Sequence, residues 1–245
     1  MSMQSNVPEW ANIQPPGGER HMPVYLLLDT SSSMEGAAIE AVRRGVEQFK
    51  NEVANDSFAR GVVKVGVITF ASEARLVGDR LMPISEFEKP DLEASGVTRL
   101  DLAFKVLFDS IHRDSDVAKA VKGGQKGDWK PAVFVLTDGQ PTDDEGNVTD
   151  DLWLPARELV INRPRGQIKP SSIVAVGCGP NVVDDTLKKI STGVAFHIDK
   201  DSAAFVALFG WLSQSITASV APGGNPDDPF ANAPLLPDSG LIRIP

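Results

Sequence analysis

The chain has 245 residues, of which 42% are hydrophobic and 23% are charged, and its net charge is −9. This composition is typical of a globular protein and allows one large α/β domain or two small ones. Non-specific nucleic-acid binding needs a basic surface, and anionic lipid attracts basic residues, so the pI near 4.9 argues against both. We therefore expect neither nucleic acid nor a membrane among the partners.

The N-terminal stretch and the cysteine content bear on where the protein works. Residues 1–22 are polar, contain Pro15-Pro16-Gly17-Gly18 and lack the features of a secretory signal, so we expect a flexible arm. We find no apolar run approaching the roughly 18 residues of a membrane span. Cys178 is the only cysteine, which excludes an intrachain disulfide, and its place at the end of a strand pattern favours a small buried hydrophobe. These features predict a cytoplasmic protein.

Strand and helix patterns alternate along the first half of the chain. The apolar run at 24–28 follows Pro23 and predicts a buried strand that ends at Asp29. A helical spacing of apolar residues follows over 39–53, and a central strand is predicted over 62–70. Residues 75–84 predict a shorter edge strand that Pro83 stops.

The second half continues the alternation. Helices are predicted near 100–111, 152–162, 184–190 and 205–216, and strands at 130–138, 173–177 and 194–198. This order predicts a doubly wound, Rossmann-like α/β fold with a mostly parallel sheet, helices on both faces and one antiparallel edge strand. We expect one domain over 23–220 and a tail rich in Pro, Gly and Asp over 221–245.

Polar side chains gather directly after the first predicted strand. Asp29, Ser31 and Ser33 share one side of an extended turn, at the sheet edge where open α/β folds bind ligands. They offer only hard oxygen donors, which suit Mg²⁺, Mn²⁺ or Ca²⁺ better than zinc or copper. Each of these residues has a purely structural alternative, because Ser and Asp after a strand often cap the next helix.

Two later segments add to this pattern. The loop Ser95-Gly96-Val97-Thr98-Arg99 precedes a predicted helix, and another predicted strand ends in Thr137-Asp138-Gly139. Asp-x-Ser-x-Ser, then Gly-x-Thr, then Thr-Asp-Gly resembles the metal-ion-dependent adhesion site of von Willebrand factor A domains. One departure is Ser32, where many members carry glycine, and it falls between ligand positions.

The resemblance implies a metal site and a way of using it. In that fold Asp29, Ser31, Ser33, Thr98 and Asp138 would meet above the sheet and hold a divalent cation, with Mg²⁺ the first choice. Two carboxylates roughly neutralise the cation, which then accepts one more anionic oxygen. The family implies that a protein partner supplies it from an Asp or Glu. The acidic tail residues Asp227, Asp228 and Asp238 could imitate that ligand.

An enzymatic alternative is a metal-dependent phosphohydrolase, because a Mg²⁺ site with two aspartates can support phosphoryl transfer. The chain has no Gly-x-x-x-x-Gly-Lys-Ser/Thr loop and lacks the paired aspartates of haloacid-dehalogenase-type phosphatases. His21, His112 and His197 are scattered outside the metal loops. We therefore expect a binding module rather than an enzyme.

Four segments narrow the resemblance further. They are 23–31, 67–71, 136–143 and 201–205, and they resemble the bacterial tellurium-resistance group of TerY-type proteins. In that group a stand-alone von Willebrand A protein is linked to a PP2C-type phosphatase and a serine/threonine kinase. The resemblance implies a metal-dependent scaffold in stress or defence signalling.

Overall fold

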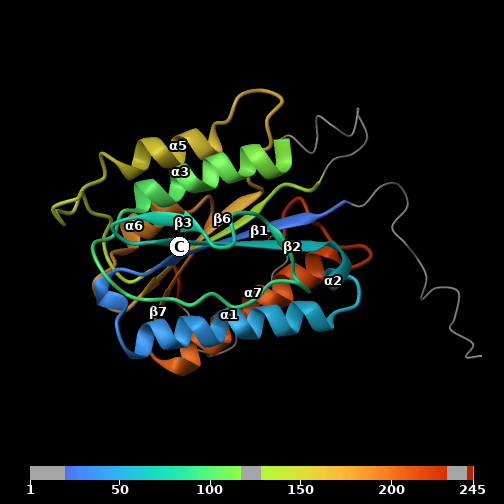
Figure 1. Ribbon diagram of the computed structural model, residues 1–245, viewed down its shortest axis with the longest axis horizontal. Helices are drawn as coiled ribbons and strands as arrows, with labels where there is room; N and C mark the ends of the chain where they lie inside the picture. The colour runs from blue at the N-terminus through green and yellow to red at the C-terminus, as the bar shows by residue number, and fades with distance from the viewer. Residues whose placement is uncertain (1–19, 117–127, 231–241, 245) are drawn as a thin grey trace, which may run out of the picture.

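The computed structural model describes residues 20–116, 128–230 and 242–244 (Figure 1). Most of the predicted arm, residues 1–19, and much of the predicted tail lie outside the described residues. The strands are β1 (Met22–Asp29), β2 (Val63–Phe70), β3 (Ala74–Leu76), β4 (Met82–Pro83), β5 (Ala132–Thr137), β6 (Ser172–Cys178), β7 (Val194–Ile198) and β8 (Ile242–Arg243). The helices are η2 (Ser32–Met34), α1 (Ala37–Asn55), α2 (Ala59–Val62), α3 (Leu100–Ile111), η3 (His112–Asp116), α5 (Trp153–Ile161), α6 (Asp184–Ile190) and α7 (Ser202–Val220).

The described strands form a single sheet in the order β3-β2-β1-β5-β6-β7-β8, with β4 also paired to β2. Neighbours from β2 to β7 run parallel, whereas β3 and β4 pair antiparallel with β2, and β8 pairs antiparallel with β7. The predicted α/β class, with a mostly parallel sheet and an antiparallel edge, is confirmed.

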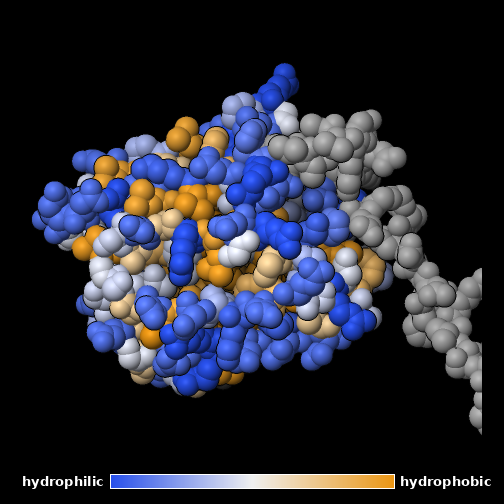
Figure 2. Space-filling model, viewed as in Figure 1, coloured by the Kyte–Doolittle hydropathy of each residue, from blue (hydrophilic) through white to orange (hydrophobic). Residues whose placement is uncertain are grey.

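Helices cover both faces of the sheet (Figure 1). Helices α1, α2 and α7 close one hydrophobic core, and α3, α5 and α6 close a second core on the opposite face. Figure 2 shows that hydrophobic residues reach this side of the surface mainly in the band between the two helix layers. Because both faces are covered, β1 is buried along its whole length, which explains its unbroken apolar run.

Helices α1 and α7 approach each other closely at Gly45. A Cβ atom added at Gly45 would overlap the ring of Phe209 on α7, so only glycine leaves room for that ring. The same core holds the apolar face of α1, including Val42, Val46 and Phe49. The helical spacing seen in the sequence thus marks the face that packs against α7 and the sheet.

Three features of the fold differ from the sequence prediction. The single edge strand predicted in 75–84 is two short strands, because the chain turns through positive φ angles at Gly78 and Asp79. The four-residue helix α2 was not predicted. Strand β7 is not the last strand, because residues near the C-terminus return to it as β8.

Helix α7 is long and apolar enough to cross a membrane. The sequence prediction that no apolar run approaches the length of a membrane span was therefore wrong. Helix α7 is the one such helix among the described residues, and 61% of its apolar window is buried inside the domain. It packs on α1 and the sheet, so its apolar composition is explained by its place in the core.

The sheet order places a crevice at the carboxyl ends of β1 and β5. The chain leaves β1 for β2 on one side, and returns to β5 on the other side of β1. Ligands of open α/β sheets bind where the strand order reverses in this way. Asp29 is the last residue of β1, and Asp138 directly follows β5.

Candidate functional site

The first loop begins at the end of β1 and holds its own carboxylate. The backbone N–H of Ser31 donates a 2.8 Å hydrogen bond to Asp29 Oδ1. The chain then makes one short turn of helix, η2, which presents the Ser33 hydroxyl on the same side as that of Ser31, 3.1 Å away. Asp29 and Ser31 are buried, whereas Ser33 is exposed.

Asp138 joins the first loop through a hydroxyl. Ser33 Oγ donates a 2.6 Å hydrogen bond to Asp138 Oδ1, although the two residues are 105 positions apart. Asp138 has no exposed surface. The structure therefore brings Asp29, Ser31, Ser33 and Asp138 together at the carboxyl ends of β1 and β5.

Thr98 reaches the same place from the loop before α3. Its backbone forms two hydrogen bonds with Thr142, of 3.1 Å and 2.9 Å. A Cβ atom at Gly139 would lie 3.5 Å from Thr98 Oγ1 and 4.0 Å from Ser33 Oγ, so both hydroxyls flank Gly139. The glycine after Asp138 thus leaves these hydroxyls free of a side chain between them.

Sequence reasoning did not single out Thr137 as a site residue. Its hydroxyl donates a 2.6 Å hydrogen bond to Asp29 Oδ2, the oxygen that Ser31 leaves free. It also lies 3.1 Å from the carbonyl oxygen of Gly139. Its position next to Asp138 in Thr-Asp-Gly was the available signal, and its role is to orient Asp29.

Lys200 was also missed, because nothing near it in the sequence belongs to a metal loop. It follows β7, and its ammonium forms an ion pair with Asp138 Oδ2. The same ammonium donates a 3.3 Å hydrogen bond to the carbonyl oxygen of Ser33. One of the two buried carboxylates therefore has a cationic partner.

Burial has a clear effect on the pKa of Asp29, the other buried carboxylate. Burial raises its pKa to about 6, and repulsion from Asp138 adds to that rise, while hydrogen bonds from Ser31 and Thr137 oppose it. A carboxylate with a raised pKa favours a nearby cation. The donors are all oxygens and include two buried carboxylates, so they fit a hard divalent cation.

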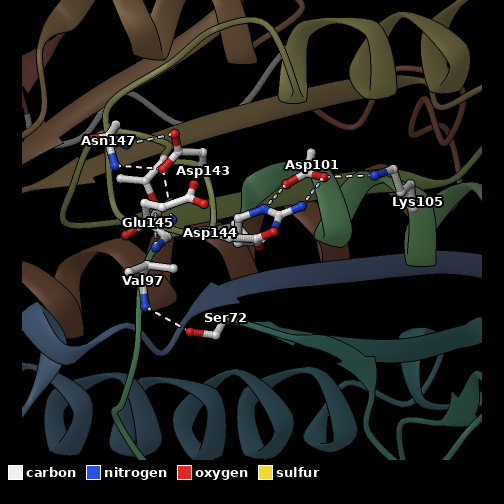
Figure 3. Close-up of polar contacts among 11 residues, drawn as sticks. Ser72, Val97, Asp101, Lys105, Asp143, Asp144, Glu145 and Asn147 are labelled. Carbon is white, nitrogen blue, oxygen red and sulfur yellow. Dashed lines mark hydrogen bonds and ion pairs between the residues drawn. The ribbon is translucent and has the colours of Figure 1, made fainter.

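The acidic loop of residues 140–151 lies beside Val97, the neighbour of Thr98 in the chain (Figure 3), and the Thr142 N–H donates a 2.9 Å hydrogen bond to the Thr98 carbonyl oxygen. Asp143 holds the loop's turn by accepting hydrogen bonds from the backbone and side chain of Asn147. Arg99 pairs with both Asp144 and the buried Asp101, which links the loop to α3. Burial acts to raise the pKa of Asp101, but hydrogen bonds from Arg99 and Lys105 outweigh it and lower that pKa. The acidic residues of this loop are therefore largely exposed, yet hydrogen bonds and ion pairs hold the loop in place.

The remaining candidate groups form no catalytic set in the described residues. Cys178 is buried, and that burial raises the pKa of its thiol, so it is a poor nucleophile. His197 contacts the carbonyl oxygen of Gly179 at 2.7 Å and Asp184 Oδ1 at 3.2 Å. Within the described ranges, no three side chains of His, Cys, Asp or Glu gather as a metal cluster. The oxygen-rich loops remain the best-formed candidate site.

The described tail residues do not supply a ligand to this site within the same molecule. Asp227 lines a hollow together with Lys130 and Arg163, near the amino ends of β5 and β6. That is the opposite edge of the sheet from Asp138. Asp238 lies outside the described residues.

Solved structures share this fold at low sequence identity. A von Willebrand factor type A protein from Catenulispora acidiphila has a TM-score of 0.56 and 16% identity, over 81% of this chain and 43% of its own. The pilus adhesin SpaC from Lactobacillus rhamnosus GG, in its open conformation, has a TM-score of 0.61 and 17% identity, over 81% and 30%. The von Willebrand factor domain of the type V pili tip protein Mfa5 from Porphyromonas gingivalis has a TM-score of 0.54 and 13% identity, over 84% and 98%.

This chain therefore spans less than half the length of the first two proteins and nearly all of the Mfa5 domain. No curated protein matches the chain. The family model of the von Willebrand factor type A domain matches residues 24–210, from β1 into α7. The chain belongs to the von Willebrand factor type A domain family.

Proposed function

We propose that this protein is a protein-binding module whose binding depends on a divalent cation. Asp29, Ser31, Ser33, Thr98 and Asp138 would hold the cation, with Mg²⁺ the first choice and Mn²⁺ or Ca²⁺ as alternatives. When bound, the cation supplies an electrophilic centre that takes a carboxylate oxygen from an Asp or Glu of the partner. The protein acts by binding rather than by catalysis.

One observation carries this proposal: two fully buried carboxylates and three hydroxyl-bearing residues meet at the crevice of the sheet. Burying a carboxylate is costly unless a cation compensates it. Asp29, with its pKa raised to about 6, has hydroxyl and amide partners, and within the described part of the chain no cationic side chain contacts it directly. A divalent cation would neutralise it, and the site's exposed side at Ser33 would admit a partner.

Relatives support a role in protein interaction. Two structures with this fold are a pilus adhesin and a pilus tip protein. From the position of the candidate metal site, we infer that the loops at the carboxyl edge of the sheet form the contact surface. The acidic loop and Arg99 would border that surface.

We also propose a cellular setting from the sequence resemblance to TerY-type proteins. The protein would work in the bacterial cytoplasm, in a tellurium-resistance, stress-response or defence system. A PP2C-type phosphatase and a serine/threonine kinase are the proposed partners. The supporting residues are the segments 23–31, 67–71, 136–143 and 201–205.

Capture of partners from bacterial lysate tests the proposal. Tagged wild-type protein is compared with Asp29→Asn and with Asp151→Asn, an exposed aspartate of the acidic loop that serves as the control. Wild-type protein and the control should capture the same partners in Mg²⁺, and should lose them in EDTA. Asp29→Asn should capture none in either buffer while its circular dichroism shows a folded protein.

Partners retained by all three proteins in EDTA would contradict metal-dependent binding. Mass spectrometry of the captured proteins tests the cellular setting separately. Partners that are neither kinases nor phosphatases would overturn that setting but leave the metal-dependent mode of binding in place.

A further inference from the structure

The positively charged Lys200 side chain lies against the candidate cation site, where its charge would oppose the binding of a divalent cation. It lies in the short turn between β7 and α7, and 30% of its side chain is exposed. Its ammonium contacts Asp138 Oδ2 and the carbonyl oxygen of Ser33. Both contacts are with residues that we assign to the cation site.

Gly179 leaves room for the Lys200 side chain to reach Asp138. The lysine stem crosses Gly179, where a Cβ atom would lie only 2.8 Å from Lys200 Cε and 3.0 Å from its Cγ. Gly179 has a φ of +81°, a backbone conformation that favours glycine. The backbone N–H of Gly179 donates a 2.9 Å hydrogen bond to the carbonyl oxygen of Ile198, which ties the two turns together.

A divalent cation and the ammonium compete for the same carboxylate. Ser33 donates to Asp138 Oδ1 and Lys200 to Asp138 Oδ2, so both oxygens of the buried carboxylate are engaged. Two cations at one carboxylate repel each other, and the repulsion is strong where burial lowers the local dielectric. The ammonium is a compact charge on a flexible stem, so it can leave toward solvent.

We propose that Lys200 is an internal competitor of the divalent cation, which must be displaced from Asp138 before the metal site is complete. The inference rests on the proposed function, because it concerns the same site. Lys200 lowers the affinity for the cation and neutralises Asp138 in the metal-free protein.

The turn that carries Lys200 leads directly into helix α7. Lys200 is followed by Asp201, whose side chain caps α7 by accepting a 2.7 Å hydrogen bond from the Ala204 N–H. Displacing Lys200 removes the contact that ties the start of α7 to the end of β5.

Calorimetric titration with Mn²⁺ alone tests the inference without a partner. Lys200→Met keeps the stem and removes the charge, and Lys200→Arg keeps a charge. Lys188→Met, at an exposed lysine of α6, is the control for losing one positive charge. We expect Lys200→Met to bind Mn²⁺ about tenfold or more tighter than wild type, a gain that corresponds to ~1.4 kcal/mol. Lys200→Arg and Lys188→Met should stay within about threefold of wild type.

The outcomes separate this inference from the proposed function. Equal Mn²⁺ affinity in wild type and Lys200→Met would overturn the competition and leave the metal site standing. Binding by Lys200→Met alone would support the competition and contradict metal-dependent function in the native chain. Absence of Mn²⁺ binding in both proteins would overturn both proposals.

Thermal unfolding gives a second measurement, which also shows whether the variant folds. In EDTA, Lys200→Met should melt at a lower temperature than wild type, because Asp138 loses its counter-charge. Saturating Mn²⁺ should raise the melting temperature of the variant more than that of wild type. A variant that melts lower than wild type by the same margin in both buffers would contradict the competition.

Discussion

Asp29 and Asp138 are both fully buried at the same sheet edge, yet their neighbours differ. Asp138 pairs with the Lys200 ammonium, whereas Asp29 accepts hydrogen bonds from the Ser31 N–H and the Thr137 hydroxyl. Hydrogen bonds from neutral groups do not offset the burial of a charge, so the pKa of Asp29 rises to about 6. In the metal-free protein, the charge of Asp29 is therefore costly to bury.

This cost predicts how stability depends on pH in EDTA. The folded protein holds the Asp29 proton more tightly than the unfolded chain, whose pKa is near 3.8. Stability should therefore fall as pH rises from about 4 through about 6. Asp29→Asn cannot ionise, and above pH 6 it should be more stable than wild type by about 2–3 kcal/mol. Urea unfolding at pH 4.5 and at pH 7.5 measures the difference.

The same two proteins, wild type and Asp29→Asn, are also compared in Mg²⁺ as a control. Asparagine keeps one oxygen for the Ser31 N–H, but it removes a charge that the cation needs, so Mg²⁺ should stabilise wild type and leave Asp29→Asn unchanged. A variant that is less stable than wild type at pH 7.5 in EDTA would show that Asp29 is ionised at little cost in the metal-free fold.

Among the elements, the close contact of α1 with α7 depends on one glycine. Gly45 faces the Phe209 ring with no room for a Cβ atom. Gly45→Ala should lower the free energy of unfolding by about 1–3 kcal/mol through overpacking, even though alanine favours helix.

Gly61 in α2 provides the matched control, because no atom lies within 4 Å of a Cβ added there. Gly61→Ala should leave stability unchanged or raise it by up to ~1 kcal/mol. Denaturant unfolding measures both variants. Equal effects of the two substitutions would show that α1 and α7 have room to separate.

Element prediction from sequence worked where a pattern is local. The sequence predicted a short helix over 184–190, and the structure places α6 at Asp184–Ile190. The prediction of one edge strand over 75–84 was wrong, because a turn splits it into two strands. That turn includes a positive φ at Asp79, which is unusual for a non-glycine residue. Strand β8 was not predicted, because its pairing with β7 joins residues more than 40 positions apart.

The site could be predicted in part for the same reason. Asp29, Ser31, Ser33, Thr98 and Asp138 stand in short motifs at strand ends, and the order of the strands brings them together. Lys200 follows β7, two strands away from β5, and reaches Asp138 only through the length of its stem across Gly179. A local sequence pattern cannot predict the contact between Lys200 and Asp138.

For the whole molecule, the described C-terminal residues return to the domain. Phe230 stacks on Trp211 of α7, with ring centroids 5.4 Å apart. Ile244 is buried in the core beneath α3, α5 and α6, and its N–H donates a 2.9 Å hydrogen bond to the carbonyl oxygen of Ala195. These contacts extend the sheet beyond β7.

Two isoleucines on this segment give a matched pair. Ile244 is 6% exposed and Ile242 is 68% exposed. Ile244→Ala should cost about 2 kcal/mol of stability, and Ile242→Ala should stay within ~0.5 kcal/mol of wild type. Urea unfolding of the full chain measures both. A neutral Ile244→Ala would show that burial of the Ile244 side chain contributes nothing to the stability of the domain.

The central claim is that a divalent cation binds at the carboxyl ends of β1 and β5. The most direct measurement is a crystal structure of the protein grown with Mn²⁺, with the cation located by its anomalous scattering. We expect one strong peak among the oxygens of Asp29, Ser31, Ser33, Thr98 and Asp138, with the Lys200 ammonium moved away from Asp138. An empty site with Lys200 still on Asp138, or a peak confined to the acidic loop, would contradict it.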